Sequence, residues 1–316
     1  MSDDHLRQQT DLLRQVRLAL RDENFPAAIG HLERTVELAR AAGDVSAAGR
    51  HLGNLALIYY RAGQPEQALK HFKTALEIAE AEDDRLTISG LLGNIGNILR
   101  EVGRPAEALD YLNRAMVIAN EAGDMRGRGI WFSNIGLVYD DLEQYKKAAE
   151  MHQRSVQIAR KLQDQRGLAA RLGNLGNTYI SQGKYAAALP RFEEAVEVFH
   201  NIGEKHELAL RLGILGNLHA ELGRGADDQQ GRNDHFSAAL TQYARALSIA
   251  QQLGDVASQA ELLRGTGNVL ANAGHYEDAI KYFKAARRNF ESLGMTAQVE
   301  LMHQSIDHCE RYRITD

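Results

Sequence analysis

Asparagine recurs at a fixed interval along this chain of 316 residues. An amide side chain carries hydrogen-bond donors and an acceptor, so a row of amides can hold the backbone of an extended peptide from either side. Hydrogen bonding between neighbouring parts of the protein, or plain solvation, is the alternative interpretation. The candidate side chains are Asn54, Asn94, Asn97, Asn134, Asn174, Asn177, Asn217 and Asn268.

The other residues that could do chemistry are scattered. No histidines are spaced His-x-x-x-His with a supporting glutamate, so we expect no metal site. The polar groups of HQSIDHC (His303 to Cys309) do not share one helix face, and Gly265 and Gly267 follow no predicted strand, which disfavours a phosphate loop. No Ser, His and Asp arrangement stands out for nucleophilic catalysis. We therefore expect no catalytic residue and no cofactor, and an enzyme is the least favoured class.

The composition argues against several kinds of partner. The net charge is −5 and charges of both signs are interspersed, so no basic face suggests a nucleic acid. No apolar run approaches the roughly 18 residues of a membrane span, and the acidic, polar N-terminus is not a signal peptide. The single cysteine, Cys309, fits a reducing compartment. These features predict a cytoplasmic protein without a membrane or nucleic-acid partner.

The asparagines belong to a repeat of forty residues, which is the strongest signal in the sequence. A polar insertion, GADDQQGRNDH at residues 225–235, interrupts the sixth copy. We expect this insertion to be a mobile surface loop that tolerates deletion, and a partner-contacting loop is the less favoured alternative. The predicted units are residues 12–51, 52–91, 92–131, 132–171, 172–211, 212–262 with the insertion, and 263–302.

Each unit is predicted to form two helices joined by a turn, and stop and start signals separate one unit from the next. The turn glycines are Gly63, Gly103, Gly183 and Gly274. Gly43, Gly123 and Gly254 suit the position after a helix, where φ is often positive, and the aspartate after each can cap the next helix. Asp84 and Asp164 keep the cap without the glycine. No alternating strand pattern occurs, so we expect an all-α protein.

Small residues recur where helices must pack closely. At 100° per residue, Ile95 and Gly96 lie on the apolar arc of their helix, whereas Asn94 and Asn97 lie away from it. We therefore expect the glycine to face a neighbouring helix and the asparagines to face an open surface. The equivalent small residues are Ala56, Gly96, Gly136, Gly176, Gly216 and Gly267 in first helices, and Ala68, Ala108, Ala148, Ala188, Ala239 and Ala279 in second helices.

A last helix is predicted at residues 296–313. Its apolar stripe could cover the end of the last unit and so cap the array. The stripe consists of Val299, Met302, Ile306 and Cys309.

These motifs resemble the tetratricopeptide repeat family. The forty-residue period is longer than that family's usual period of about 34 residues, and is similar to the long-helix subclass of Pins-type adaptors and kinesin light chains. The resemblance implies a right-handed α-solenoid of seven helix pairs with a C-terminal capping helix. In RLGNLGNTYISQGKYAAALPRFEEAVEV, the family pattern is carried by Leu175, Gly176, Tyr179, Gly183, Tyr185, Ala188, Phe192 and Ala195.

The resemblance also implies a concave groove along the first helices, into which the asparagines would point. Arg50, with Arg14 and Arg17 from the first unit, lies where Pins-type adaptors carry groove arginines. A solvated basic patch is the alternative reading of these arginines. The carboxylate clamp of chaperone-binding members is not expected, because the third unit would supply Gly90 and Asn94 in place of its basic residues. An acidic ligand is therefore not strongly implied.

The predicted function is a non-enzymatic scaffold or adaptor that binds a partner protein or an extended peptide in this groove. The alternative is a peptide sensor whose solenoid changes shape on binding and so controls a second partner. The fold serves many functions, so the sequence leaves the ligand and the oligomeric state open.

Overall fold

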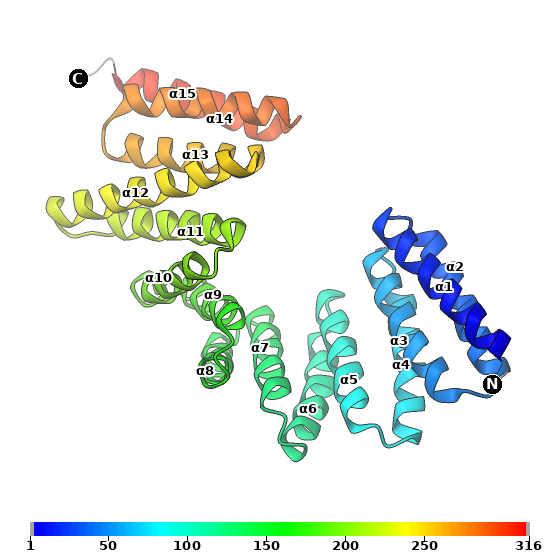
Figure 1. Ribbon diagram of the computed structural model, residues 1–316. Coiled ribbons are helices and arrows are strands. Elements are labelled where there is room, and N and C mark those ends of the chain that lie inside the picture. Colours follow the sequence, from blue (N-terminus) through cyan, green and yellow to red (C-terminus); the bar gives the residue numbers. More distant parts are fainter. Residues whose placement is uncertain (1–2, 314–316) are drawn as a thin grey trace. The chain divides into compact units, whose positions relative to one another are not determined.

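The computed structural model describes residues 3–313, with side chains from residue 7 onward. In that range the chain is built from fifteen helices and contains no strand (Figure 1). In chain order the helices are α1 (Asp3–Arg21), α2 (Phe25–Ala41), α3 (Val45–Arg61), α4 (Pro65–Ala81), α5 (Arg85–Glu101), α6 (Pro105–Glu121), α7 (Met125–Asp141), α8 (Tyr145–Lys161), α9 (Gln165–Ser181), α10 (Tyr185–Asn201), α11 (Lys205–Arg224), α12 (Gln229–Leu253), α13 (Val256–Asn272), α14 (Tyr276–Ser292) and α15 (Thr296–Arg313).

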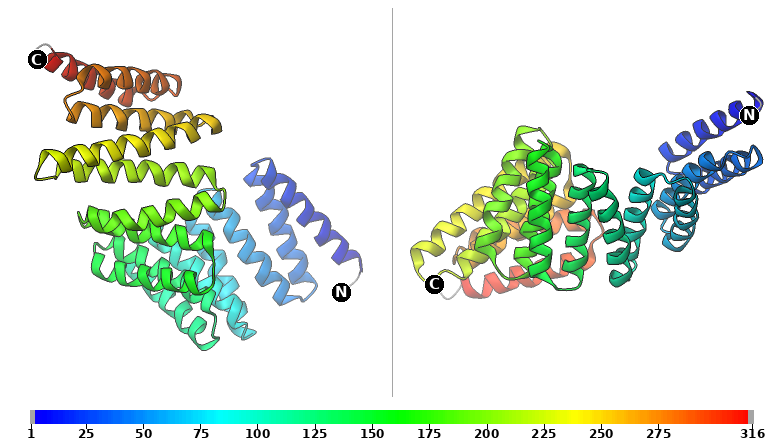
Figure 2. Two further views of the ribbon diagram at one scale, coloured as in Figure 1. Left: turned by 60° about the vertical axis from the view of Figure 1, so that its left-hand side comes forward. Right: turned by 90° about the horizontal axis from the view of Figure 1, so that it is seen from below.

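The chain forms two compact units, Met1–Ile158 and Ala159–Asp316. Within each unit a helix packs mainly on the helices before and after it in sequence, as the successive colours in Figure 2 show. Weaker contacts join the first helices of successive pairs, α5 with α7 and α11 with α13. Packing in which each helix pair contacts the pairs before and after it is that of a solenoid. The predicted all-α solenoid of seven helix pairs with a capping helix is therefore confirmed.

The chain turns at an interval of twenty residues up to position 203, and each turn contains one residue with positive φ. Glycine adopts this left-handed conformation without a steric penalty, which fits the predicted turn positions. Four turns instead use Glu23, Asp83, Glu143 or Gln163, at φ of 53 to 55°. The glycines with positive φ are Gly43, Gly63, Gly103, Gly123, Gly183, Gly203, Gly254, Gly274 and Gly294.

The predicted aspartate caps are confirmed. Each of these side chains accepts a hydrogen bond from the backbone N–H three residues later, at 2.8 to 3.1 Å. Such a bond satisfies one of the N–H groups that the first turn of a helix leaves free. The capping residues are Asp44, Asp84, Asp124, Asp164 and Asp255.

The recurring glycines of the first helices allow close packing, as predicted. A Cβ atom on Gly96 would lie 2.7 Å from Leu112 Cγ and 3.2 Å from the Ala108 carbonyl oxygen. Gly267 has the same relationship to Phe283, at 2.6 Å. Each recurring alanine of the second helices is fully buried.

Gly93 shows that the α5 helix is covered on more than the predicted apolar arc. The ring of Trp131 on α7 occupies the space where a side chain at Gly93 would lie. Trp131 Nε1 also donates a hydrogen bond of 3.1 Å to Ser89 Oγ on α5. Asn94 and Asn97 of the same helix are half-buried.

The insertion is largely helical, so the expectation of a loop is wrong for residues 229–235. The α11 helix continues to Arg224, and α12 begins at Gln229 with Asp228 accepting a 2.6 Å hydrogen bond from the Gly231 N–H. Gly223 stands where other units have a turn glycine, but here it is helical. A Cβ atom at Gly223 would lie 2.6 Å from Phe236 Cδ1, so this glycine now serves packing between α11 and α12.

The α15 helix covers the end of the second unit. Its Met302, Ile306 and Cys309 are buried in one cluster with residues of α13 and α14, and Val299 packs partly against the same cluster. The predicted apolar stripe is therefore confirmed. Between residues 3 and 313, none of the helices combines the length and the apolar composition needed to cross a membrane.

Candidate functional site

A cavity of about 690 Å³ lies in the second unit, between the first helices α9, α11 and α13. Three predicted asparagines line it, one from each of these successive helices: Asn177, Asn217 and Asn268. Its volume falls in the range of about 300–1,000 Å³ that is usual for ligand pockets. The repeat thus brings together residues that lie far apart in sequence.

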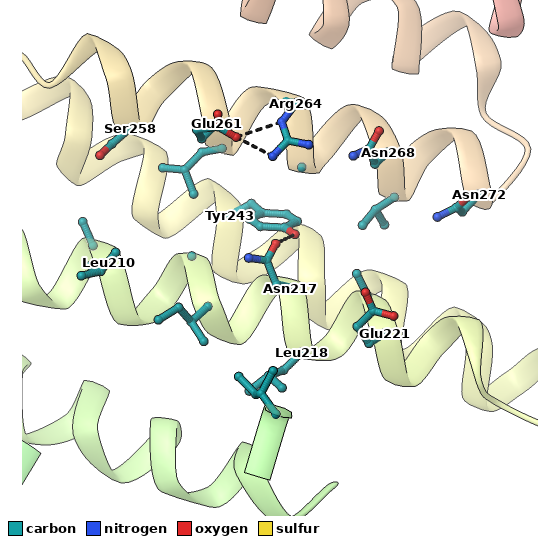
Figure 3. Close-up of a pocket in the computed structure, with 18 of the residues that line it drawn as sticks. Leu210, Asn217, Leu218, Glu221, Tyr243, Ser258, Glu261, Arg264, Asn268 and Asn272 are labelled. Atoms are coloured by element: carbon teal, nitrogen blue, oxygen red, sulfur yellow. Dashed lines mark hydrogen bonds and ion pairs between the residues drawn. The ribbon is translucent and has the colours of Figure 1, made fainter. Parts of the chain in front are cut away.

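Tyr243 of α12 lies in the middle of the residues that line this cavity. Its hydroxyl donates a 2.6 Å hydrogen bond to Asn217 Oδ1, and its side chain lies between α11 and α13 (Figure 3). Gly216 and Gly265 make room for the ring, because a Cβ atom at either would lie within 2.9 Å of it. Burial raises the pKa of the Tyr243 phenol to about 12, so the group is a neutral donor at pH 7. Since the Asn217 oxygen accepts this bond, the amide NH₂ is the group that Asn217 can offer to a ligand.

The charged side chains of the cavity are paired within their own helices. Arg264 lies 2.6 Å from the Glu261 carboxylate on α13, as the dashed lines in Figure 3 show. Arg224 forms an ion pair with Glu221 on α11. Each guanidinium is therefore balanced by a carboxylate three residues earlier.

Apolar side chains form the rest of the lining. Leu210 of α11 is 49% exposed. Ile180, Ile214 and Val269 lie beside it around the same cavity. An apolar surface with a few convergent amides suits a peptide segment that presents an apolar side chain and backbone polar groups. Among the described lining residues there is no histidine or cysteine.

A smaller cavity of about 220 Å³ repeats the pattern in the first unit. Asn94 and Asn97 of α5 and Asn134 of α7 line it. Tyr60 donates a hydrogen bond to the Glu101 carboxylate at its edge, and this bond, with burial, raises the pKa of Tyr60. Asparagines from successive first helices therefore meet in both units.

The remaining predicted site residues lie outside these two cavities. Asn174 is half-buried and the others are exposed. Arg50 donates a 2.7 Å hydrogen bond to the Ser46 hydroxyl one helical turn earlier, so its guanidinium group lies against its own helix, α3. The residues concerned are Asn54, Asn174, Arg14, Arg17 and Arg50.

Sequence reasoning missed several residues of the larger cavity. Arg264 and Asn272 lie four residues before and after Asn268, and Glu221 lies four residues after Asn217. The helical period would have found these residues, because positions four apart share a helix face. Tyr243 could not be found in this way, since it comes from the second helix of its pair, 26 residues from Asn217.

Solved structures with the same fold are similar along nearly the whole chain. Apo RapI matches with a TM-score of 0.62 at 16% identity, over 98% of this chain and 99% of that one. A signal-transduction ATPase with a tetratricopeptide repeat sensor from Pyrococcus horikoshii matches at 0.65 and 16%, over 98% of this chain and 52% of that one. A Rap protein complexed with competence and sporulation factor matches at 0.55 and 14%, over 98% of each chain. At these identities the likeness shows the fold.

The sequence itself matches models of one family. The search of curated proteins by sequence found no match. Models of the tetratricopeptide repeat match residues 11–81, 87–161, 168–201 and 224–294, which together make up most of the chain. These matches agree with the repeat, the helix pairs and the neighbouring folds, and the chain belongs to the tetratricopeptide repeat family.

Proposed function

We propose that this protein is a non-enzymatic scaffold or adaptor that holds an extended peptide, or a segment of a partner protein, along its first helices. The observation that carries the proposal is the meeting of Asn177, Asn217 and Asn268 around one cavity. Three amides on successive first helices can bond backbone groups several residues apart on an extended chain, because such a chain rises only about 3.3 Å per residue and packed helices lie about 8–10 Å apart. A cytoplasmic location is part of the proposal.

The lining of the cavity supports a peptide of modest charge with at least one apolar side chain. The Glu261–Arg264 and Glu221–Arg224 pairs already neutralise the local charges. The exposed Leu210 and its apolar neighbours offer a surface that gains free energy when water is removed from it. Asn94, Asn97 and Asn134 in the first unit are proposed as equivalent contacts. Asn54, Asn174, Arg14, Arg17 and Arg50 are proposed as contacts of a longer ligand that extends beyond the cavities.

A peptide sensor is the second candidate. Two structures with the same fold support it: a Rap protein complexed with competence and sporulation factor, and an ATPase with a repeat sensor. A sensor requires that the bound and free chains differ in shape, because a ligand shifts an equilibrium only through different affinities for the two states. Small-angle scattering of the full chain with and without a bound peptide separates the two candidates. An unchanged scattering curve favours the adaptor, and a changed curve favours the sensor.

The binding proposal is tested by selecting peptides from a displayed random library on the full chain. A selected peptide is then titrated against the double variant Asn177→Ala/Asn268→Ala. Loss of two amide hydrogen bonds should cost about 1–3 kcal/mol of binding free energy, roughly a five- to 140-fold rise in Kd. Asn217 is left in place because it also bonds Tyr243.

Asn113→Ala is the matched control. Asn113 is an exposed asparagine in the middle of α6, so its replacement changes the same chemical group in the same kind of element. It should leave Kd unchanged. Equal affinity of the selected peptide for the wild type and the double variant would contradict the proposed site, and failure to select any peptide would contradict the peptide-binding function.

A further inference from the structure

Two histidines contact each other within the sixth helix pair, and neither lines the larger cavity. His219 of α11 and His235 of α12 have their Nδ1 atoms 3.2 Å apart. The ring centroids are 5.5 Å apart and the ring planes are inclined by 37°. Both side chains are half-buried, so the pair is held in place and still reaches solvent.

His219 departs from the repeat, and His235 lies at the end of the insertion. The position of His219 is occupied by tyrosine in three other units, at Tyr59, Tyr139 and Tyr179. His235 directly precedes Phe236, as His275 precedes Tyr276 in the seventh unit. Gly223 allows the approach, because a Cβ atom there would lie 3.3 Å from His235 Cβ. The insertion thus brings a second imidazole beside the first.

This pair is separate from the larger cavity. Asn217 and Glu221 line the cavity from α11, whereas His219 does not. Two residues along a helix correspond to a rotation of about 200°, so His219 faces nearly the opposite side from Asn217. Neither histidine is therefore needed for the proposed peptide site.

We propose that His219 and His235 chelate a divalent transition metal that prefers imidazole ligands, with Zn²⁺ as the representative ion. Zinc binds imidazole nitrogen at about 2.0–2.1 Å with tetrahedral geometry, which places two ligand nitrogens roughly 3.3 Å apart. The observed 3.2 Å between the two Nδ1 atoms matches this spacing. Chelation requires each ring to be neutral with its proton on Nε2. In the pair of neutral rings, the proton between the two Nδ1 atoms therefore transfers through solvent to Nε2 of the donor ring, and both rings turn so that their Nδ1 lone pairs point at the ion. Water completes the coordination.

A metal requires the lone pair of a neutral imidazole nitrogen, and the distance between the two Nδ1 atoms is the observation that carries the proposal. The alternative is a hydrogen bond between two neutral rings that serves only to join α11 and α12.

The His-x-x-x-His spacing, whose absence led us to expect no metal site, describes histidines of one helix. It cannot reveal this pair, whose members lie 16 residues apart on different helices. Among the described residues, no group of three or more His, Cys, Asp or Glu side chains is placed to hold a metal. The proposed site therefore has two protein ligands. Open coordination positions are typical of exchangeable sites, whereas structural zinc sites carry four protein ligands.

The test is calorimetric titration of the metal-free full chain with ZnCl₂, repeated with NiCl₂. The wild type should bind one ion at this site. His235→Ala and His219→Tyr should each weaken that binding at least about tenfold. His219→Tyr restores the residue found in other units, so it should fold normally. His206→Ala, an exposed histidine on the same helix, should leave the affinity unchanged.

Thermal unfolding gives a second readout. Zn²⁺ should raise the Tm of the wild type and of His206→Ala, because a ligand of the folded state stabilises it by mass action, and should not raise the Tm of the two site variants. Equal Zn²⁺ affinity in the wild type and the site variants would overturn the proposal. Lower Tm in the site variants, with no response of the wild type to Zn²⁺ or Ni²⁺, would also overturn it in favour of the structural hydrogen bond.

Discussion

The Tyr243 hydroxyl on α12 donates a 2.6 Å hydrogen bond to the Asn217 amide oxygen on α11. Tyr243 is 3% exposed, whereas Asn217 is exposed at the surface of the cavity. One bond therefore links the packing of a helix pair to a side chain that a ligand could contact. The same asparagine supports both interpretations of the repeated amides, the structural one through its oxygen and the ligand-binding one through its nitrogen.

Replacing Tyr243 with Phe should destabilise the protein while keeping the ring in place. The lost hydrogen bond is worth about 0.5–1.5 kcal/mol of unfolding free energy. Urea denaturation of the full chain measures the change. Tyr282→Phe on α14 is the control, because that side chain is 36% exposed and its hydroxyl can bond water. A Tyr243→Phe variant as stable as the wild type would show that the bond contributes nothing to the packing of α11 on α12.

The stability of the protein should fall at alkaline pH, partly because of Tyr243. Burial raises the pKa of this phenol to about 12, against about 10 in an unfolded chain. Between these values the folded state keeps a proton that the unfolded state has lost, so the free energy of unfolding decreases as pH rises. Tyr243→Phe should reduce this decline, as denaturation curves from about pH 9 to pH 11 would measure. Tyr59, whose pKa is also raised to about 12, should keep part of it.

Two glycines of α5 should respond in opposite ways to replacement by alanine. Gly96→Ala places Cβ 3.2 Å from the Ala108 carbonyl oxygen and closer still to Leu112, so overpacking should cost about 1–3 kcal/mol. Gly90→Ala meets nothing within 4 Å and should stabilise by about 0.5–1 kcal/mol, because alanine is the better helix former. Thermal or chemical denaturation of both variants measures the change in the free energy of unfolding. A stabilised Gly96→Ala variant would contradict the packing role of the recurring glycine.

The turns offer a second matched pair. Gln163 adopts φ of 54° where most turns have glycine, so Gln163→Gly should stabilise by about 1 kcal/mol through relief of the left-handed conformation. Gly183→Ala, at φ of 70°, should destabilise by a similar amount even though the space around it is open. Opposite shifts in Tm are expected. Tm shifts of the same sign in the two variants would show that the left-handed backbone conformation does not determine the stability of these turns.

The repeated asparagines, capping aspartates and packing glycines could be located from the sequence because each depends on position within one helix. The helical period placed Gly96 against its neighbour and Asp164 at a helix start, and both are found there. The helical period could not show which side chain of a neighbouring helix contacts a given position. The ring of Trp131 on Gly93 and the bond from Tyr243 to Asn217 both depend on distances between helices, which a repeat pattern does not contain.

The helical structure of the insertion was hidden from the sequence for a related reason. Its polar composition is typical of loops, and the composition of residues 225–235 does not reveal that Phe236 would pack on Gly223. That contact, with the Asp228 cap, allows polar residues to continue a helix that is solvated on one side. The pairing of His219 with His235 follows from this extension and was therefore equally hidden.

Deletion of residues 225–235 should still be tolerated. Removal joins Leu222, Gly223 and Arg224 directly to Phe236, which matches Gln182, Gly183, Lys184 and Tyr185 in the preceding unit. Gly223 can then adopt positive φ and form the usual turn. The Tm should change by less than about 5 °C. A larger decrease would show that the extended ends of α11 and α12 contribute substantially to stability.

The twenty-residue interval between turns also has an evolutionary consequence. Residues 85–124 run from the residue after one aspartate cap through the next cap, so they form a cassette whose ends have the same local structure. Duplication or loss of such a cassette in the gene creates no new kind of junction. The number of cassettes can therefore change without disturbing the turns, and each cassette gained or lost adds or removes one set of asparagine positions. An insertion of any other length must instead be accommodated within a single helix pair, as residues 225–235 are.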